Sequence, residues 1–170
     1  VPASEVAEVE AKLRAFLDRI CLVDGEDWED GFSIGLKHSQ VIILLISEKG
    51  LERTLEADKW SDNVLLEFEM ALQMRKEKKA SILPLFVKNA DHKPFNGYGM
   101  PFPDAKHKCE KSKAAGTVKD TMKELFKLQG VSISWDDEFM LRWPDIEEAL
   151  VKADGGKVNM EFDCDEKSCK

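Results

Sequence analysis

Long hydrophobic runs and an excess of positive charge are both missing from this 170-residue sequence. The continuous apolar run Val41–Ile46 is far shorter than the roughly 20 residues that a membrane-spanning helix requires. The net charge is −8 and the isoelectric point is near 5.0, whereas general nucleic-acid binding needs a clustered basic surface. The sequence therefore predicts neither a membrane span nor a nucleic-acid partner.

Cysteine is scarce, and its positions show no paired spacing. The four cysteines are Cys21, Cys109, Cys164 and Cys169. Without a disulfide framework, reduced thiols in a cytoplasmic protein are the expectation. A zinc site needs four converging ligands with shorter paired spacings, so no metal site is predicted. The chain opens with Val1 and shows no apolar signal core, and we expect it to be a piece of a longer polypeptide.

Motifs of several nucleotide-handling classes are also missing. No Gly-x-Gly-x-x-Gly follows a predicted strand, which argues against dinucleotide redox chemistry. No phosphate-binding loop ending in Gly-Lys-Ser/Thr is present. A phosphoacceptor receiver domain needs an aspartate after its third strand, and this chain has Ser47 after Val41–Ile46.

What is present is an alternation of strands and helices. Strands are predicted at 13–17, 41–46, 81–87 and 131–135, and helices at 5–12, 28–38, 61–79, 117–128 and 144–153. Each strand is almost continuously apolar, and 41–46 is expected to be covered on both faces, so an α/β domain with a parallel sheet is predicted. Residues 1–154 are expected to form one domain, followed by a charged, disordered tail at 155–170. The long loop 89–116 is expected to be functional or mobile.

The predicted helix 61–79 holds the most informative cluster. Its apolar stripe, at helical spacing, consists of Val64, Leu65, Phe68, Ala71 and Leu72. Glu67 lies on one flank of that stripe and Glu69 on the other. Trp60 and Asn63 share the flank of Glu67, so an aromatic ring, an amide and a carboxylate line one edge. From spacing alone, this edge is either a ligand site or an ordinary boundary between core and solvent.

Taken in order, the segments resemble the TIR (Toll/interleukin receptor) domain family over roughly residues 5 to 153. The similar segments are 15–18 with 21–32 (second strand and BB loop), 35–47 (helix and third strand ending in the family's Ser), 63–72 (the helix with the family's glutamate), 82–87 (fourth strand with its Pro), 129–135 (fifth strand) and 143–150 (box-three helix). The resemblance implies a flavodoxin-like three-layer fold with a parallel sheet in the strand order 2-1-3-4-5. It places the family's first strand before Val1, so that strand is expected to be missing from this chain. Ligands of such sheets bind at the carboxyl ends of the strands.

Several members of this family cleave NAD⁺ between nicotinamide and ribose. By resemblance, the catalytic glutamate is Glu67, four residues before Ala71 in the family's Glu-x-x-x-Ala-Leu pattern. Loss of nicotinamide builds positive charge on the ribose, and a carboxylate stabilises that state. NAD⁺ is then a substrate, and no cofactor is expected. The expected substrate-binding residues are Trp28, Trp60, Asn63, Ser47 and Asp18.

Other family members mainly assemble signalling complexes through contacts between TIR domains. The resemblance implies a BB-loop interface formed by Leu22, Asp24, Gly25 and Asp27. Asp24 stands where many adaptor members have proline, and Asn63 stands where the family often has an aromatic residue. A cytoplasmic signalling or effector domain is expected, with NAD⁺ cleavage and non-catalytic TIR–TIR association as the two alternatives.

Overall fold

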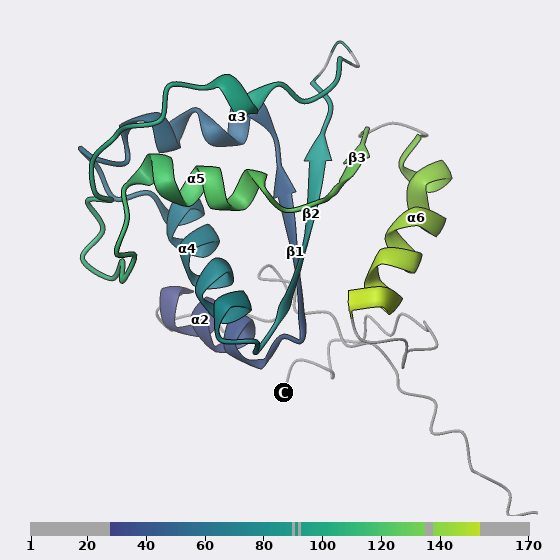
Figure 1. The fold of residues 1–170 in the computed structure, drawn as a ribbon, viewed down its shortest axis with the longest axis horizontal. Helices are drawn as coiled ribbons and strands as arrows, with labels where there is room; N and C mark the ends of the chain where they lie inside the picture. Colours follow the sequence, from purple (N-terminus) through teal and green to yellow (C-terminus); the bar gives the residue numbers. More distant parts are fainter. Residues whose placement is uncertain (1–27, 90, 92, 135–137, 154–170) are drawn as a thin grey trace, which may run out of the picture.

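The computed structural model describes residues 28–89, 91, 93–134 and 138–153. Figure 1 shows a central sheet with α4 and α5 on one side and α6 on the other, so the described part has three layers. The elements in chain order are α2 (Trp28–His38), β1 (Val41–Ile46), α3 (Glu48–Leu51), the 3₁₀ helix η1 (Arg53–Glu56), α4 (Asn63–Lys76), β2 (Ser81–Val87), the 3₁₀ helix η2 (Gly97–Gly99), α5 (Val118–Phe126), β3 (Val131–Ile133) and α6 (Glu138–Ala153).

The three described strands are parallel and lie in the order β1-β2-β3. This is the flavodoxin-like α/β arrangement that the sequence predicts. β2 is the middle strand even though it contains Pro84, which pairs with Leu44 of β1. The elements predicted at 5–12 and 13–17, the loop 21–27 and the tail 155–170 lie outside the described residues.

Each face of the sheet has its own hydrophobic core. On one face, Ile42, Leu44 and Ile46 join a large cluster with residues of α4 and α5. On the other face, α6 packs on β2 and β3 through Ile146 and Leu150. Both faces of the sheet therefore take part in packing against helices.

The prediction that β1 is covered on both faces is wrong. The side chains of β1 alternate, and Ile43 and Leu45 are 45% and 54% exposed. On their face of the sheet α6 packs against β2 and β3, and its cover leaves Ile43 and Leu45 of β1 exposed. An apolar run in sequence thus marks a strand without showing how many of its faces are covered.

Helix boundaries differ from the predictions where capping and proline decide them. α4 begins at Asn63, because Asp62 takes the extended conformation of a cap. α6 begins at Glu138, six residues before the predicted start, and Pro144 lies inside it. Pro144 suits a first helical turn, but a helix can also continue through a proline at the expense of one backbone hydrogen bond. The described strand β3 ends at Ile133, two residues before the predicted end.

The long segment between β2 and α5 is anchored by aromatic rings. Four rings contact one another at tilted or edge-on angles, with centroids 5.0 to 6.0 Å apart: Phe86 of β2, Phe95 and Tyr98 of the segment, and Phe126 of α5. Such contacts stabilise beyond the burial of their area. Most of this segment is irregular, as predicted, but its rings are fixed against β2 and α5.

α5 begins with a capping box, from which a dependence of stability on pH can be predicted. The Asp120 carboxylate accepts hydrogen bonds from the backbone N–H and the hydroxyl of Thr117, and these lower the pKa of Asp120. Because the pKa of Asp120 is lower in the folded protein than in the unfolded chain, its ionisation stabilises the fold at pH values above the ordinary carboxyl pKa. This stabilisation is lost as the pH falls through the pKa of the folded state. We expect Asp120→Asn to lower the melting temperature at neutral pH.

The difference from the wild type should disappear at strongly acidic pH, where both side chains are uncharged. Thermal melts of both proteins across the acid range measure it. The control is Asp91→Asn, in an exposed turn away from any helix start. If the melting temperature of Asp120→Asn stays below that of the wild type by the same amount down to the lowest pH, the ionised carboxylate is not what stabilises the cap.

Candidate functional site

The site is built around the first two turns of α4. Asp62 caps this helix, because its Oδ1 accepts the backbone N–H of Leu65 at 2.7 Å. Leu65, Phe68 and Ala71 are buried at a three-residue spacing, which directs one side of a helix towards a core. The remaining edge of α4 carries Asn63 and Glu67, four residues apart and therefore on one face.

Asn63 and Glu67 line the same open hollow, whose volume is about 1550 Å³. α2, α4, the segment 111–116 and α5 form its walls. Glu67 is half-buried and Asn63 is exposed. Lys37 of α2 and Lys113 of the segment also line the hollow, so it offers cations as well as carboxylates. A small ligand that carries both a positive and a negative group matches this charge pattern.

Ala71 supports the register that the family pattern requires. It is completely buried, and it lies one helical turn after Glu67. Glu67 therefore lies at the margin of the core, which is where the sequence pattern places it.

The other predicted site residues are dispersed. Trp60 is 68% exposed and is not among the residues that line the hollow. Ser47 follows β1 and caps α3, since its Oγ accepts the N–H of Gly50 at 3.0 Å. Trp28 begins α2, and its side chain lies outside what the structure describes, as do Asp18 and the BB-loop residues Leu22, Asp24, Gly25 and Asp27. Of the predicted cluster, the structure brings together Asn63 and Glu67.

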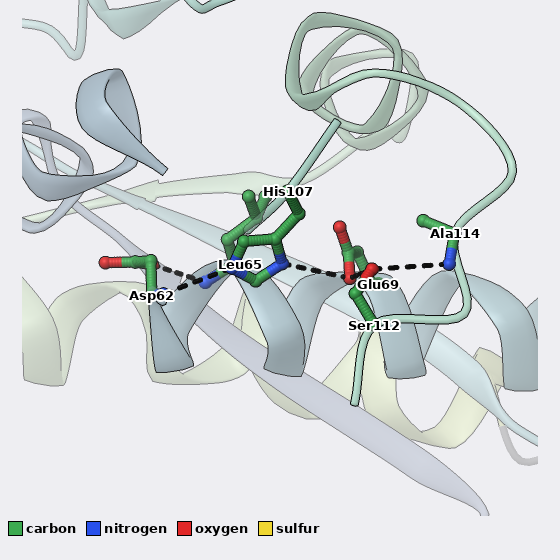
Figure 2. A network of polar contacts seen from close by, with 6 residues as sticks. All are labelled: Asp62, Leu65, Glu69, His107, Ser112 and Ala114. Atoms are coloured by element: carbon green, nitrogen blue, oxygen red, sulfur yellow. Dashed lines mark hydrogen bonds and ion pairs between the residues drawn. The ribbon is translucent and has the colours of Figure 1, made fainter. Parts of the chain in front are cut away.

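A buried polar network lies on the other flank of α4, at Asp62 and Glu69, and the sequence does not predict it (Figure 2). His107 Nε2 lies 3.1 Å from the backbone nitrogen of Asp62, and its Nδ1 lies 3.3 Å from Glu69 Oε2. Ser112 Oγ donates to the same Glu69 oxygen at 2.6 Å. Glu69 is 8% exposed and His107 is 9% exposed. We call these four residues (Asp62, Glu69, His107 and Ser112) the His107 clasp.

The clasp does not have the geometry of a nucleophilic serine. In a Ser–His–acid arrangement the imidazole accepts the proton of the serine hydroxyl. Here Ser112 donates to Glu69, and His107 Nε2 faces a backbone N–H. The network therefore joins the segment 107–112 to α4, and Ser112 does not donate to the imidazole as a serine nucleophile of this kind would.

Sequence patterns gave no sign of the clasp. Helical spacing places Glu69 on the flank of the helix, where a carboxylate is ordinarily solvated, but in the structure His107 and Ser112 contact it and it is buried. Those two residues lie in an irregular segment 38 and 43 positions further along the chain. One signal was available for Asp62, because aspartate directly before an apolar-periodic run is a helix cap.

Fold and site together define a class: an α/β domain of flavodoxin-like architecture with a carboxylate at the margin of a helix beside the sheet. A comparison with family profiles agrees, since the profile described as TIR domain matches residues 6–117. The chain belongs to the TIR domain family. No curated protein and no solved structure gave a significant match.

Membership of this family supports a role as a signalling domain. It also suggests partners that carry TIR domains themselves. Among the helices of the described residues, none has the length and apolar character needed to cross a bilayer.

Proposed function

We propose that this TIR domain cleaves NAD⁺, releasing nicotinamide and leaving ADP-ribose or a cyclic form of it. The observation that carries the proposal is the position of Glu67, half-buried in the wall of a hollow that Asn63 and several lysines share. In this reaction Glu67 is the catalytic residue. No bound cofactor takes part, and the domain acts in the cytoplasm without a nucleic-acid partner.

The chemistry follows from the charges of the substrate. As the bond to nicotinamide breaks, the ribose gains oxocarbenium character, and a fixed carboxylate favours this state over the ground state. Nicotinamide leaves as a neutral ring, so a second carboxylate acting as a general acid is unnecessary. The diphosphate of NAD⁺ is an anion, and Lys37 and Lys113 supply cations in the same hollow. Asn63 offers an amide to the ribose hydroxyls.

A second candidate is a TIR–TIR interaction module without catalysis. The observation that favours it is apolar exposure, since Ile43, Leu45, Trp60 and Tyr98 are each more than two-fifths exposed. Exposed apolar groups of this size gain free energy when a partner covers them. The two functions are compatible, because an enzyme can depend on assembly to complete its site.

Nicotinamide release from NAD⁺ by the purified protein tests the proposal. The assay is run across a range of protein concentrations, with sedimentation velocity on the same samples. Release that Glu67→Gln abolishes supports the enzyme. A folded, self-associated protein that releases no nicotinamide at any concentration rejects it and leaves the interaction module.

A further inference from the structure

The segment 107–112, which supplies His107 and Ser112 to the clasp, lies across the beginning of α4 and is fixed at several points. The backbone N–H of Lys108 donates to the carbonyl of Ala57 at 2.7 Å, just before α4. His107 contacts Asp62 at the cap, and Ser112 contacts Glu69 almost two turns further along the helix. Figure 2 shows the contacts of His107 and Ser112 following one side of the helix. The segment therefore holds the same turns that present Asn63 and Glu67.

The contacts of His107 fix where its proton lies. A backbone N–H can only donate, so Nε2, which faces the N–H of Asp62, must be an acceptor without a proton. A neutral imidazole then has its proton on Nδ1, which donates to Glu69. Both ring nitrogens are satisfied only in this neutral tautomer.

The groups that face His107 come from three segments. α4 supplies the carboxylate of Glu69, and the segment itself supplies the hydroxyl of Ser112, which donates to that same carboxylate. The carboxylate of Asp62 points to Leu65 N–H and lies 3.9 Å from Arg53 of η1. A proton added to His107 would strengthen its attraction to Glu69, but it would place two N–H groups head to head at Asp62.

We propose that His107 is a positioning residue for Glu67: in its neutral form it holds the first two turns of α4 in the catalytic position, and protonation releases them. The catalytic part of this inference rests on the proposed function. Asp62 is next to Asn63 and five residues before Glu67, so loss of its backbone contact loosens the start of the helix that carries both. Activity then falls as the pH falls, although His107 does not touch the substrate.

The first test needs no activity. Long-range ¹H–¹⁵N spectra of protein labelled at histidine nitrogens report which ring nitrogen carries the proton, and the signal that His107→Gln removes belongs to His107. We expect the proton on Nδ1 near neutral pH, and faster amide exchange for Asp62 than in the wild type when His107 is replaced by alanine. A proton on Nε2 overturns the proposal.

The second test separates positioning from folding by kinetics. We expect His107→Ala to lower kcat for nicotinamide release by about 10- to 100-fold with little change in KM, as a displaced catalytic group does. His107→Gln keeps a neutral donor and acceptor, so it should recover most of kcat and make the activity less sensitive to acid than that of the wild type. His38→Ala, an exposed histidine at the end of α2, is the control and should match the wild type.

The outcomes keep the two proposals apart. If alanine and glutamine at position 107 lower kcat equally and keep the wild-type pH profile, His107 is not a positioning residue. If the wild type releases no nicotinamide, the proposed function fails, and the clasp is then judged on its tautomer and on the exchange of the Asp62 amide.

Discussion

Replacing Glu67 with glutamine is expected to lower the rate of nicotinamide release by about 10²- to 10³-fold, which is the usual cost of removing one preorganised electrostatic group. The change keeps the size of the side chain and removes its charge. Ground-state binding of NAD⁺ should change little, because the positive charge on the ribose appears only as the bond breaks. The loss should therefore appear in kcat more than in KM.

The matched control for this experiment is Glu56→Gln in η1. Glu56 is an exposed glutamate whose carboxylate lies 3.5 Å from Lys59 Nζ, and it lies outside the hollow. The Glu56→Gln variant should release nicotinamide at the wild-type rate. Glu56→Gln and Glu67→Gln should both keep the wild-type melting temperature and sedimentation profile. Glu67→Gln with a rate within threefold of the wild type would remove Glu67 from the mechanism even if the domain cleaves NAD⁺.

The largest effect on stability is expected from Gly130→Ala. A Cβ atom at Gly130 would lie 2.3 Å from the carbonyl oxygen of Pro84 and 2.8 Å from the ring of Phe86. Pro84 belongs to β2, which is paired on both sides, so its backbone cannot move without breaking strand pairing. Overpacking a well-packed core costs about 1 to 3 kcal/mol, and the close approach to a paired backbone puts this case near the upper end, at ~3 kcal/mol.

Chemical denaturation measures the difference, with Gly99→Ala as the control. A Cβ atom at Gly99 meets nothing within 4 Å. There, alanine should change the free energy of unfolding by less than about 0.5 kcal/mol, or raise it slightly by restricting the unfolded chain. Equal stability of the two variants would mean that β3 can shift away from β2 at little cost.

The sequence predicted those parts of the fold that depend on local pattern. The bounds of α2, β1 and β2 agree with the predicted bounds, because apolar periodicity and the flanking polar residues determine them. Short elements in the polar connection after β1 were missed: α3 exists because Ser47 caps it, and four residues are too few to show a period. The start of α6 was missed because Pro144 is a stronger start signal in sequence than it is in the folded helix.

For the site, the sequence could predict only what lies within one helix. Asn63 and Glu67 are on the same element, so their spacing alone places them on one face, and the structure agrees. Trp60 shares that spacing but lies before the helix begins, and there the helical period does not apply. The clasp depends on where a long irregular segment crosses α4, and that is decided by ring packing and backbone contacts that no periodicity reveals.

The parallel register has a consequence for how quickly this chain folds. Val41 pairs with Ser81, and Leu85 pairs with Val131, so each pairing closes a loop of roughly 40 residues or more. The chain loses the entropy of that closure before any sheet contact stabilises it. The contacts within α4 and α5 are local, whereas each strand pairing needs its long loop to close first. We therefore expect this domain to refold more slowly than a helical bundle of the same length. During that delay the apolar strand β1 is exposed to other chains.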